Sequence, residues 1–408
     1  VSNDGNDFTG DGSLDNPFRH IQWAINAASS GNTIVVFPGE YDENITITSK
    51  DLTIIGDDEL NPKTINGQGI DDVINVNNAN YFILRDFVIT NGTDGIEINN
   101  CSSVDLNNIS VSENSTNGII VDESGYVIVD SVDVISNSVG IKILDSDSIS
   151  ISYSVADSND NEGVYISNTK GIITDNTISD NGRGIRFDSN GSDDLILTRV
   201  RVEGNTLTNS NGAGLYIGSN NQNIDVTITD CRFLSNNINS GNYGAAIYSR
   251  SNSLSISGTR FKDNYTSSGG SALYIDGSDA DIEITNSIFT GNSGHTSYGS
   301  VFCTNADVSI TDCIFLNNEQ NMFGGTSTYS TSANITILNS IVWENSLMST
   351  SWSNMNLAVT YSCIEGDYSG VGNISSNPQF CNPFDDTLTL AISSPCIGTG
   401  WYNENMGG

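Results

Sequence analysis

The hydrophobic and polar positions of this chain repeat in a nine-residue frame over most of its length. The frame reads: an aliphatic residue, two variable residues, a small or apolar residue, a variable one, an apolar one, two variable ones and Asn. Residues 228–236 (ITDCRFLSN), 284–292 (ITNSIFTGN) and 310–318 (ITDCIFLNN) show it most clearly. The frame fits twelve times, about two dozen residues apart, and closes at Asn91, Asn114, Asn137, Asn159, Asn181, Asn205, Asn236, Asn264, Asn292, Asn318, Asn345 and Asp367.

The positions of the frame form lanes that predict a solenoid. The first position is aliphatic in all twelve copies, from Ile83 to Val359, and the sixth is apolar in all of them. Such lanes arise when each copy is one coil of a parallel β-solenoid, with equivalent side chains roughly 4.8 Å apart. An Asn stacked at a turn also satisfies backbone groups that the bend leaves unpaired. A second strand follows each Asn after a Gly corner. We therefore predict an all-β fold, a single right-handed parallel β-helix.

Both ends of the chain depart from the frame and are expected to cap the solenoid, whose terminal coils would otherwise expose a sheet edge. Asn16–Pro17 is typical of a helix start, and apolar residues recur at helical spacing from Ile21 to Ala28. This predicts an amphipathic helix over 16–30. The tail is rich in Gly, Ser, Asn and Pro. We predict an N-terminal cap over 1–32, about 13 to 14 coils over 33–367 and an irregular C-terminal cap over 368–408.

Composition and charge exclude several classes of function. The chain has 408 residues, with 14 Lys and Arg against 49 Asp and Glu and a formal net charge of −35. Nucleic acids and acidic membrane surfaces would repel it, and no apolar stretch is long enough to span a membrane. Because the first residues lack a leader, we expect a secreted or cell-surface protein whose signal peptide has been removed. Eight Asn-x-Ser/Thr sequons make it a candidate glycoprotein: Asn44, Asn91, Asn108, Asn114, Asn190, Asn264, Asn334 and Asn373.

The cysteines are a weak indication of disulfides, and the acidic segments are a weak indication of a metal site. Seven cysteines are scattered over the chain, and we expect buried thiols, with Cys381 and Cys396 in the tail as the candidate disulfide. A zinc site is not expected, because the chain has two His and no Cys-x-x-Cys. The Asp-rich segments 4–15 and 157–163 could hold calcium, although neither has EF-hand spacing and solvated turns explain them as well. We predict no cofactor and leave calcium open.

Both ends of the chain resemble a known group of proteins. Residues 1–25 (VSNDGNDFTGDGSLDNPFRHIQWAI) and 31–41 (GNTIVVFPGEY) resemble the secreted right-handed β-helix proteins of the pectin-lyase-like superfamily. Residues 361–366 (YSCIEG), 372–380 (GNISSNPQF) and 393–400 (SSPCIGTG) look like the C-terminal end of its surface-exported bacterial members. The resemblance implies export and surface display. It implies no particular activity, since the superfamily contains lyases, hydrolases and adhesins.

One set of residues could support catalysis. In the outward lane of the strand after each Asn, Lys142, Tyr165 and Arg186 would lie on adjacent coils about 5 Å apart. A polysaccharide lyase acting by β-elimination needs a base and a cation that neutralises the uronate carboxylate, and these residues could supply both. Long side chains also stack well on an exposed sheet, and the net charge opposes a polyuronate. A hydrolase is not expected, because the paired Asp residues lack His and basic neighbours.

The same lane carries a run of aromatic residues: Tyr165, Tyr216, Tyr248, Tyr274 and Phe302. If they are exposed, their faces form a platform that suits neutral glycans or a protein partner. Insertions in the second half of the chain lengthen the loops beside this lane, where recognition usually occurs. These loops either present the ligand or cover the platform.

These observations predict a secreted, surface-displayed β-helix with a binding or structural role. That role is adhesion, a place in an extracellular matrix or filament, or glycan attachment, with no catalytic residue. The expected partner is a polysaccharide or another cell-surface component, and self-association through caps or lateral faces is left open. The alternative is a polysaccharide lyase that acts on a uronate-containing polysaccharide at Lys142, Tyr165 and Arg186.

Overall fold

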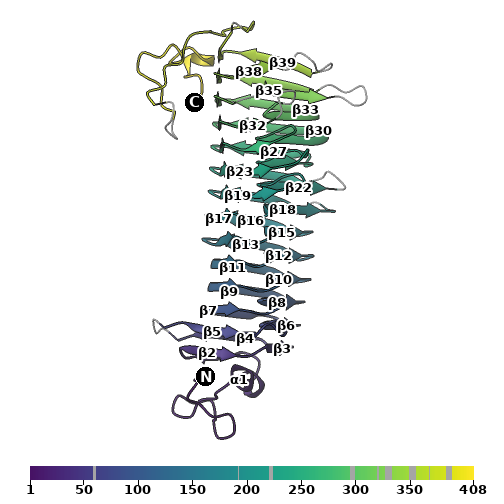
Figure 1. The fold of residues 1–408 in the computed structure, drawn as a ribbon, viewed down its shortest axis with the longest axis vertical. Helices are drawn as coiled ribbons and strands as arrows, with labels where there is room; N and C mark the ends of the chain where they lie inside the picture. The colour runs from purple at the N-terminus through teal and green to yellow at the C-terminus, as the bar shows by residue number, and fades with distance from the viewer. Residues whose placement is uncertain are drawn as a thin grey trace. The chain divides into compact units, whose positions relative to one another are not determined.

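The chain folds into coils of parallel β-strands (Figure 1). The computed structural model describes residues 1–57, 61–191, 193–219, 224–294, 299–318, 321–326, 333–348, 355–366, 368–382 and 388–408. Its contacts divide the chain into two compact units, Val1–Ser189 and Asn190–Gly408. The helical elements in the described residues are α1 (Ile21–Ala27) and the 3-10 turn η1 (Trp401–Asn403). Neither is long and apolar enough to cross a bilayer.

In the first unit, each coil adds one strand to each of three parallel stacks. The first stack contains β1 (Asn32–Val36), β4 (Leu52–Gly56), β7 (Phe82–Thr90), β9 (Ser103–Ser112), β11 (Tyr126–Ile135), β13 (Ser148–Ser152) and β16 (Lys170–Thr174). The second stack contains β2 (Gly39–Asp42), β5 (Lys63–Asn66), the second halves of β7, β9 and β11, β14 (Val155–Asp157) and β17 (Thr177–Ser179). The third stack contains β3 (Ile45–Thr48), β6 (Ile74–Asn77), β8 (Ile96–Asn99), β10 (Asn117–Asp122), β12 (Val139–Leu144), β15 (Glu162–Ser167) and β18 (Arg183–Ser189).

The second unit has the same three stacks and one more. Its first stack contains β19 (Leu195–Thr198), β23 (Asp225–Thr229), β27 (Ser253–Ser257), the second halves of β30 (Leu273–Thr285) and β33 (Val301–Thr311), β36 (Ala333–Leu338) and β39 (Met355–Thr360). Its second stack contains β20 (Arg201–Glu203), β24 (Arg232–Leu234), β28 (Arg260–Lys262), β31 (Ile288–Thr290), β34 (Ile314–Leu316), β37 (Ile341–Trp343) and β40 (Cys363–Ile364). Its third stack contains β22 (Leu215–Ser219), β26 (Ile247–Ser249), the first halves of β30 and β33, β35 (Asn321–Thr326) and β38 (Ser346–Met348). The additional stack contains β21 (Thr206–Leu207), β25 (Asn237–Ile238), β29 (Tyr265–Thr266) and β32 (Ser293–Gly294).

The register of the strands confirms the predicted parallel β-helix. Val129, Ile151 and Ile173 hold the first frame position on successive coils, pair in register and are at most 1% exposed. Each coil bends where a residue adopts a left-handed φ, as at Ser131 (56°) and Ser136 (58°), just before the fourth and ninth frame positions. Because successive side chains of a strand point to opposite faces, the aliphatic lanes all point into the interior of the solenoid. The last predicted closing position, Asp367, lies outside the described residues.

The first copy of the frame was predicted one residue out of register. Leu84, not Ile83, pairs with Leu106 and is fully buried. The closing position is correspondingly Gly92, whose N–H donates to the next Asn of the lane at 2.8 Å, while Asn91 is exposed. Residue type could not separate two adjacent aliphatic residues, and a slip of one residue exchanges the inner and outer faces.

The Asn lane forms a hydrogen-bonded ladder inside each unit, from Asn114 to Asn181 and from Asn205 to Asn345. In every step, the Oδ1 of one Asn accepts from the backbone N–H and the Nδ2 of the Asn one coil earlier, at 2.8 to 3.3 Å. This confirms the predicted role of the lane. Two of the sequons, at Asn114 and the fully buried Asn264, use their amides here, so their side chains are not available to a glycan.

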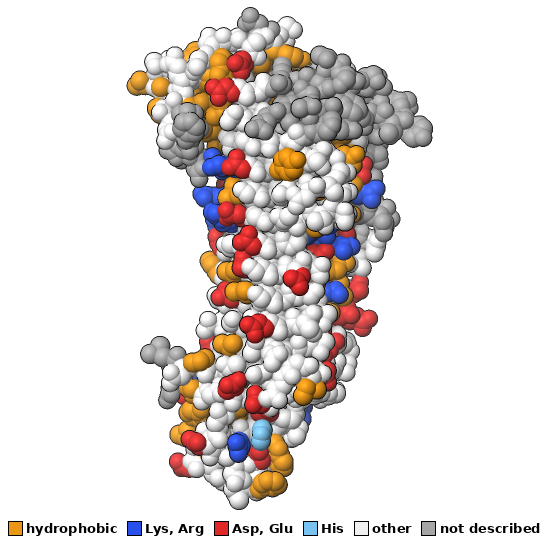
Figure 2. All heavy atoms as spheres, viewed as in Figure 1, with side chains coloured by type: hydrophobic (Ala, Val, Ile, Leu, Met, Phe, Trp, Pro, Cys, Tyr) orange, Lys and Arg blue, Asp and Glu red, His pale blue; other side chains and the backbone are white. Residues whose placement is uncertain are grey.

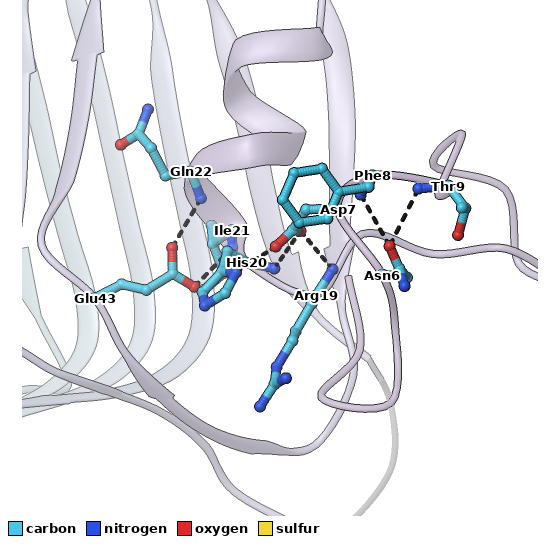
Figure 3. Close-up of polar contacts among 9 residues, drawn as sticks. All are labelled: Asn6, Asp7, Phe8, Thr9, Arg19, His20, Ile21, Gln22 and Glu43. Carbon is cyan, nitrogen blue, oxygen red and sulfur yellow. Dashed lines mark hydrogen bonds and ion pairs between the residues drawn. The ribbon is translucent and has the colours of Figure 1, made fainter.

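The N-terminal helix is shorter than predicted. It begins at Ile21 instead of Pro17, because Asn16 is held in a bridge with Ser13. The Glu43 carboxylate accepts the N–H groups of Ile21 and Gln22 at 2.8 and 2.9 Å, as Figure 3 shows. At the other end, the Lys50 ammonium donates to three carbonyl groups of residues 25–28 at 2.8 to 3.1 Å. The first coils therefore satisfy both ends of the capping helix.

A hydrogen-bonded acid holds the loop that leads into α1. The Asp7 side chain accepts the N–H groups of Arg19 and His20 at 2.9 and 3.0 Å and lies 2.5 Å from His20 Nδ1 (Figure 3). Desolvation raises the pKa of Asp7, but the hydrogen bonds from His20 and Arg19 outweigh it and leave this pKa below its ordinary value. The folded state therefore favours the ionised carboxylate.

Replacing Asp7 by Asn is expected to destabilise the cap at neutral pH and to matter little in acid. Because the pKa of Asp7 is lower when folded, its stabilising contribution is present above the unfolded pKa of about 4 and is lost as the pH falls through the folded value. Thermal denaturation of both proteins at pH 7 and at low pH measures this. The gap between their midpoints should close in acid, and a gap independent of pH would contradict the assignment.

Candidate functional site

The structure brings the three candidate lyase residues together on the third stack of the first unit. Lys142 on β12 pairs in register with Tyr165 on β15, which pairs with Arg186 on β18. All three side chains are partly buried on the outer face of the stack. The lane therefore runs as the sequence predicted.

Acidic neighbours hold the Arg186 side chain in place. Its Cζ lies 4.6 Å from the centre of the Tyr165 ring, a cation–π arrangement. Its Nε is 2.7 Å from Asp188 Oδ2, and its Nη1 is 3.7 Å from Glu162 Oε1. Glu162 also pairs with the buried Arg183 at 2.8 Å. These partners were not predicted from the sequence, although Asp188 follows Arg186 by two residues and so lies on the same face.

The electrostatics at Tyr165 and Arg186 do not suit proton abstraction. Burial raises the pKa of Tyr165, and the Asp188 carboxylate raises it further although Arg186 opposes the change. Burial lowers the pKa of Arg186, but its attraction to Asp188 and Tyr165 outweighs burial and leaves the pKa above its ordinary value. At neutral pH both groups keep their protons. A general base needs a pKa near the working pH, so neither residue is prepared for that role.

The aromatic residues of the second unit form a column of parallel rings. Tyr216 and Tyr248 stack with ring centres 5.3 Å apart, Tyr248 and Tyr274 at 5.5 Å, and Tyr274 and Phe302 at 5.1 Å. The predicted lane is therefore correct. The exposure that a platform requires is absent at Tyr248, Tyr274 and Phe302, which are only 5%, 9% and 2% exposed.

The inserted loops cover the aromatic column. Tyr243, from one insertion, packs on Tyr274 with ring centres 4.5 Å apart. Gly212, Gly244 and Gly270 have φ near +70°, and a Cβ at any of them would come within 2.8 Å of a tyrosine Cβ. The loops cross the column so closely that only glycine fits. The column is thus a second apolar cluster and no platform for a ligand at Tyr248, Tyr274 or Phe302.

A groove that the sequence did not predict lies in the second unit. It has a volume of about 580 Å³ and separates the second stack from residues 377–380 of the tail. Leu316, Trp343 and Phe380 give it an apolar floor, and all three pack on one buried cluster. The frame places Trp343 on the outer face of β37. Only the return of the tail turns that face into a groove.

The rim of the groove is charged and polar. Arg260 and Lys262 on β28 line one part of it, and Asp263 and Glu344 line the bends. Thr290 also lines the groove, and its buried Oγ1 has no hydrogen-bond partner among the described residues. Figure 2 shows the wider setting, in which acidic side chains are scattered over the visible face and basic ones gather in a few groups. An apolar floor with a few polar groups at its edge is the usual composition of a ligand site.

The acidic segments that could hold calcium have local roles in the structure. Asp11 accepts a hydrogen bond from the N–H of Ser13 at 2.9 Å. Asp157 accepts hydrogen bonds from the hydroxyl groups of Ser158 and Ser179 at 2.8 and 2.5 Å. Within the part of the chain that the structure describes, no three His, Cys, Asp or Glu side chains are grouped to hold a metal ion. Calcium binding stays a prediction.

The structure does not pair Cys381 with Cys396. Both are free thiols; Cys381 is exposed and Cys396 is fully buried. The tail turns the Cys396 side chain into an apolar cluster with Cys363, away from the surface on which Cys381 lies. The Cys381–Cys396 bond is thus not formed in this arrangement and stays a prediction, since spacing in the sequence could not show which way the tail folds.

Two family models match parts of the chain, and several solved structures are similar to it at low identity. Residues 72–233 match the family model of the right handed beta helix region, and residues 3–59 match a family described as protein of unknown function, DUF1565. Pectate lyase Pel9A is similar over 100% of this chain and 94% of its own, at 14% identity and a TM-score of 0.33. Bacteriophage CBA120 tailspike protein 3 is similar over 86% of this chain and 55% of its own, at 13% identity and a TM-score of 0.44. The alginate lyase from Paenibacillus is similar over 82% of this chain and 96% of its own, at 13% identity and a TM-score of 0.25. No match was found among curated proteins.

The chain folds as a right-handed parallel β-helix. The strand register and the match of residues 72–233 establish this fold. A fold shared by so many activities does not assign one, so the function has to be argued from the site.

Proposed function

We propose that this protein is an extracellular, surface-displayed β-helix with a binding role, and that a carbohydrate of a cell surface or matrix binds in the groove beside Trp343. The composition of the groove carries the proposal. A Trp face packs against the C–H face of a sugar ring, while charged and hydroxyl groups at the rim bind its hydroxyl groups. Arg260 and Lys262 supply such groups on β28, and Asp263 and Glu344 supply them at the bends.

The alternative is a polysaccharide lyase, and the register of Lys142, Tyr165 and Arg186 favours it. Against it stand the raised pKa values of Tyr165 and Arg186 and the acidic neighbours of Arg186. Incubation with a panel of uronate polysaccharides separates the two functions. We expect no ultraviolet-absorbing unsaturated product. Its appearance, and its loss in Arg186→Ala, would establish the lyase instead.

Replacing Trp343 by Ala is expected to weaken carbohydrate binding about two- to tenfold, since an aromatic contact contributes about 0.5 to 1.5 kcal/mol. A panel of neutral and uronate polysaccharides identifies the ligand, and calorimetry then measures the affinity of both proteins. Because Trp343 lies on an outer face, the fold should survive the change, and circular dichroism checks this.

Trp23→Ala is the matched control. Trp23 is 44% exposed and lies in the first unit, outside the groove, so its loss should leave the affinity unchanged. Equal affinity in wild type and Trp343→Ala would remove the groove from the proposal. Failure of every polysaccharide to bind would remove the carbohydrate role and leave a structural one.

A further inference from the structure

Two cysteines meet under the C-terminal cap. Cys363 lies on β40, the last strand of the second stack, where its N–H donates to Ser340 O at 2.9 Å. Cys396 lies 33 residues later (396 − 363) in the tail, where its carbonyl accepts the N–H of Met406 at 2.9 Å. Both are fully buried in one apolar cluster, and the backbone hydrogen bonds fix each of them from a different side.

The two thiols also contact each other. Their side chains share a hydrogen bond, and Cys363 Sγ lies 3.0 Å from Ser376 O. The other five cysteines have no such neighbour among the described residues: Cys101, Cys231, Cys303 and Cys313 are buried on separate coils, and Cys381 is exposed. A disulfide requires two cysteines that lie close together, and the shared hydrogen bond within one buried cluster makes Cys363 and Cys396 neighbours.

We propose that Cys363 and Cys396 form a disulfide that locks the C-terminal cap to the last coil of the solenoid. The bond would close a loop of the tail that includes residues 377–380, which form one wall of the groove beside Trp343. It would limit the freedom of that loop in the unfolded chain and hold its end in the folded one. This inference concerns the stability of the cap and is independent of what the groove binds.

The chemistry needs a disulfide oxidant, such as oxidised glutathione or a disulfide-bearing oxidoreductase. The hydrogen bond from Cys363 lowers the pKa of Cys396, so Cys396 is the thiol that ionises first. Its thiolate attacks the oxidant, forming a mixed disulfide and releasing one thiol. The Cys363 sulfur then attacks the Cys396 sulfur, forms the new bond and releases the second thiol, so that two protons and two electrons pass to the oxidant. Because both cysteines are buried, the reaction occurs before the tail docks or when it opens locally.

Oxidation of the full chain with oxidised glutathione, followed by alkylation in denaturant, tests the pairing. Five of the seven cysteines are expected to alkylate, and mass spectrometry of the proteolytic peptides should show one linked pair that contains Cys363 and Cys396. Alkylation of all seven, or a peptide that links Cys396 to Cys381, would overturn the proposal.

The stability of the cap gives a second measurement. Reduction of the oxidised protein should lower its thermal midpoint by roughly 5 to 10 °C and speed proteolysis of the tail. Cys363→Ser and Cys396→Ser should show no effect of reductant. Cys313→Ser is the matched control, since it removes a buried thiol of the same unit that has no thiol partner, and it should keep the full effect. An equal response to reductant in Cys363→Ser and wild type would also overturn the proposal.

Discussion

Replacing Phe289 by Ala is expected to lower the free energy of unfolding by about 3 to 5 kcal/mol. Phe289 is fully buried in a column of rings inside the second stack, with ring centres 4.6 Å from Phe261 and 4.5 Å from Phe315. Removing one ring takes packing from the coils on both sides. Because each coil contacts mainly its neighbours, the column cannot close over the cavity without moving the backbone.

Chemical denaturation followed by circular dichroism measures this effect. Phe289→Leu, which keeps most of the volume, should lose less than about 1.5 kcal/mol. Tyr265→Ala, at a 42% exposed position of the same unit, should change the stability by no more than about 0.5 kcal/mol. A loss at Phe289→Ala no larger than that at Tyr265→Ala would show that the ring column does not hold the coils together.

Replacing Asn264 by Ala is expected to cost about 2 to 4 kcal/mol, the second-largest effect. Its Nδ2 donates to Phe233 O at 3.0 Å, and its Oδ1 accepts from the N–H and Nδ2 of Asn236 at 3.0 and 3.1 Å. The side chain is fully buried, so no water replaces it. The change leaves backbone and side-chain groups of the preceding coil unsatisfied, at about 1 to 3 kcal/mol for each buried group.

Asn356→Ala is the matched control for the ladder. Asn356 is exposed on β39, and its Nδ2 donates to the side chain of Asn334 at 2.9 Å. Its replacement should change the free energy of unfolding by no more than about 0.5 kcal/mol. Denaturation curves for the two variants compare an inner and an outer Asn, and similar losses would contradict the role of the ladder.

The frame predicted the inner lanes and the Asn ladder because both depend on neighbours one coil away. Each coil repeats the same contacts, so the aliphatic, Phe and Asn positions carry their structural role in the local sequence. The same regularity predicted the outward lane from Lys142 to Arg186 and from Tyr216 to Phe302. Among the frame positions that the structure describes, register failed only in the first copy, where adjacent aliphatic residues allowed a slip of one position.

The candidate sites depended on parts of the chain that do not repeat. Whether Tyr248 and Tyr274 are exposed was decided by the insertions, whose glycines lie directly against the tyrosine Cβ atoms. The local net charge around Arg186 was decided by its acidic neighbours Glu162 and Asp188, which offset the charge of the guanidinium. The lane showed which residues are adjacent, but not which of them solvent or a ligand can reach.

The sequence by itself thus determined the coil, its inner lanes and the order of the outward residues, because these follow from a period that each coil imposes on the next. Only the tertiary structure decided the start of α1 at Ile21, the burial of the tyrosine column, the groove beside Trp343 and the meeting of Cys363 with Cys396. The physical reason is the range of the contacts. Caps, insertions and the tail pack on residues far away in the sequence, and the repeat does not predict which residues those are.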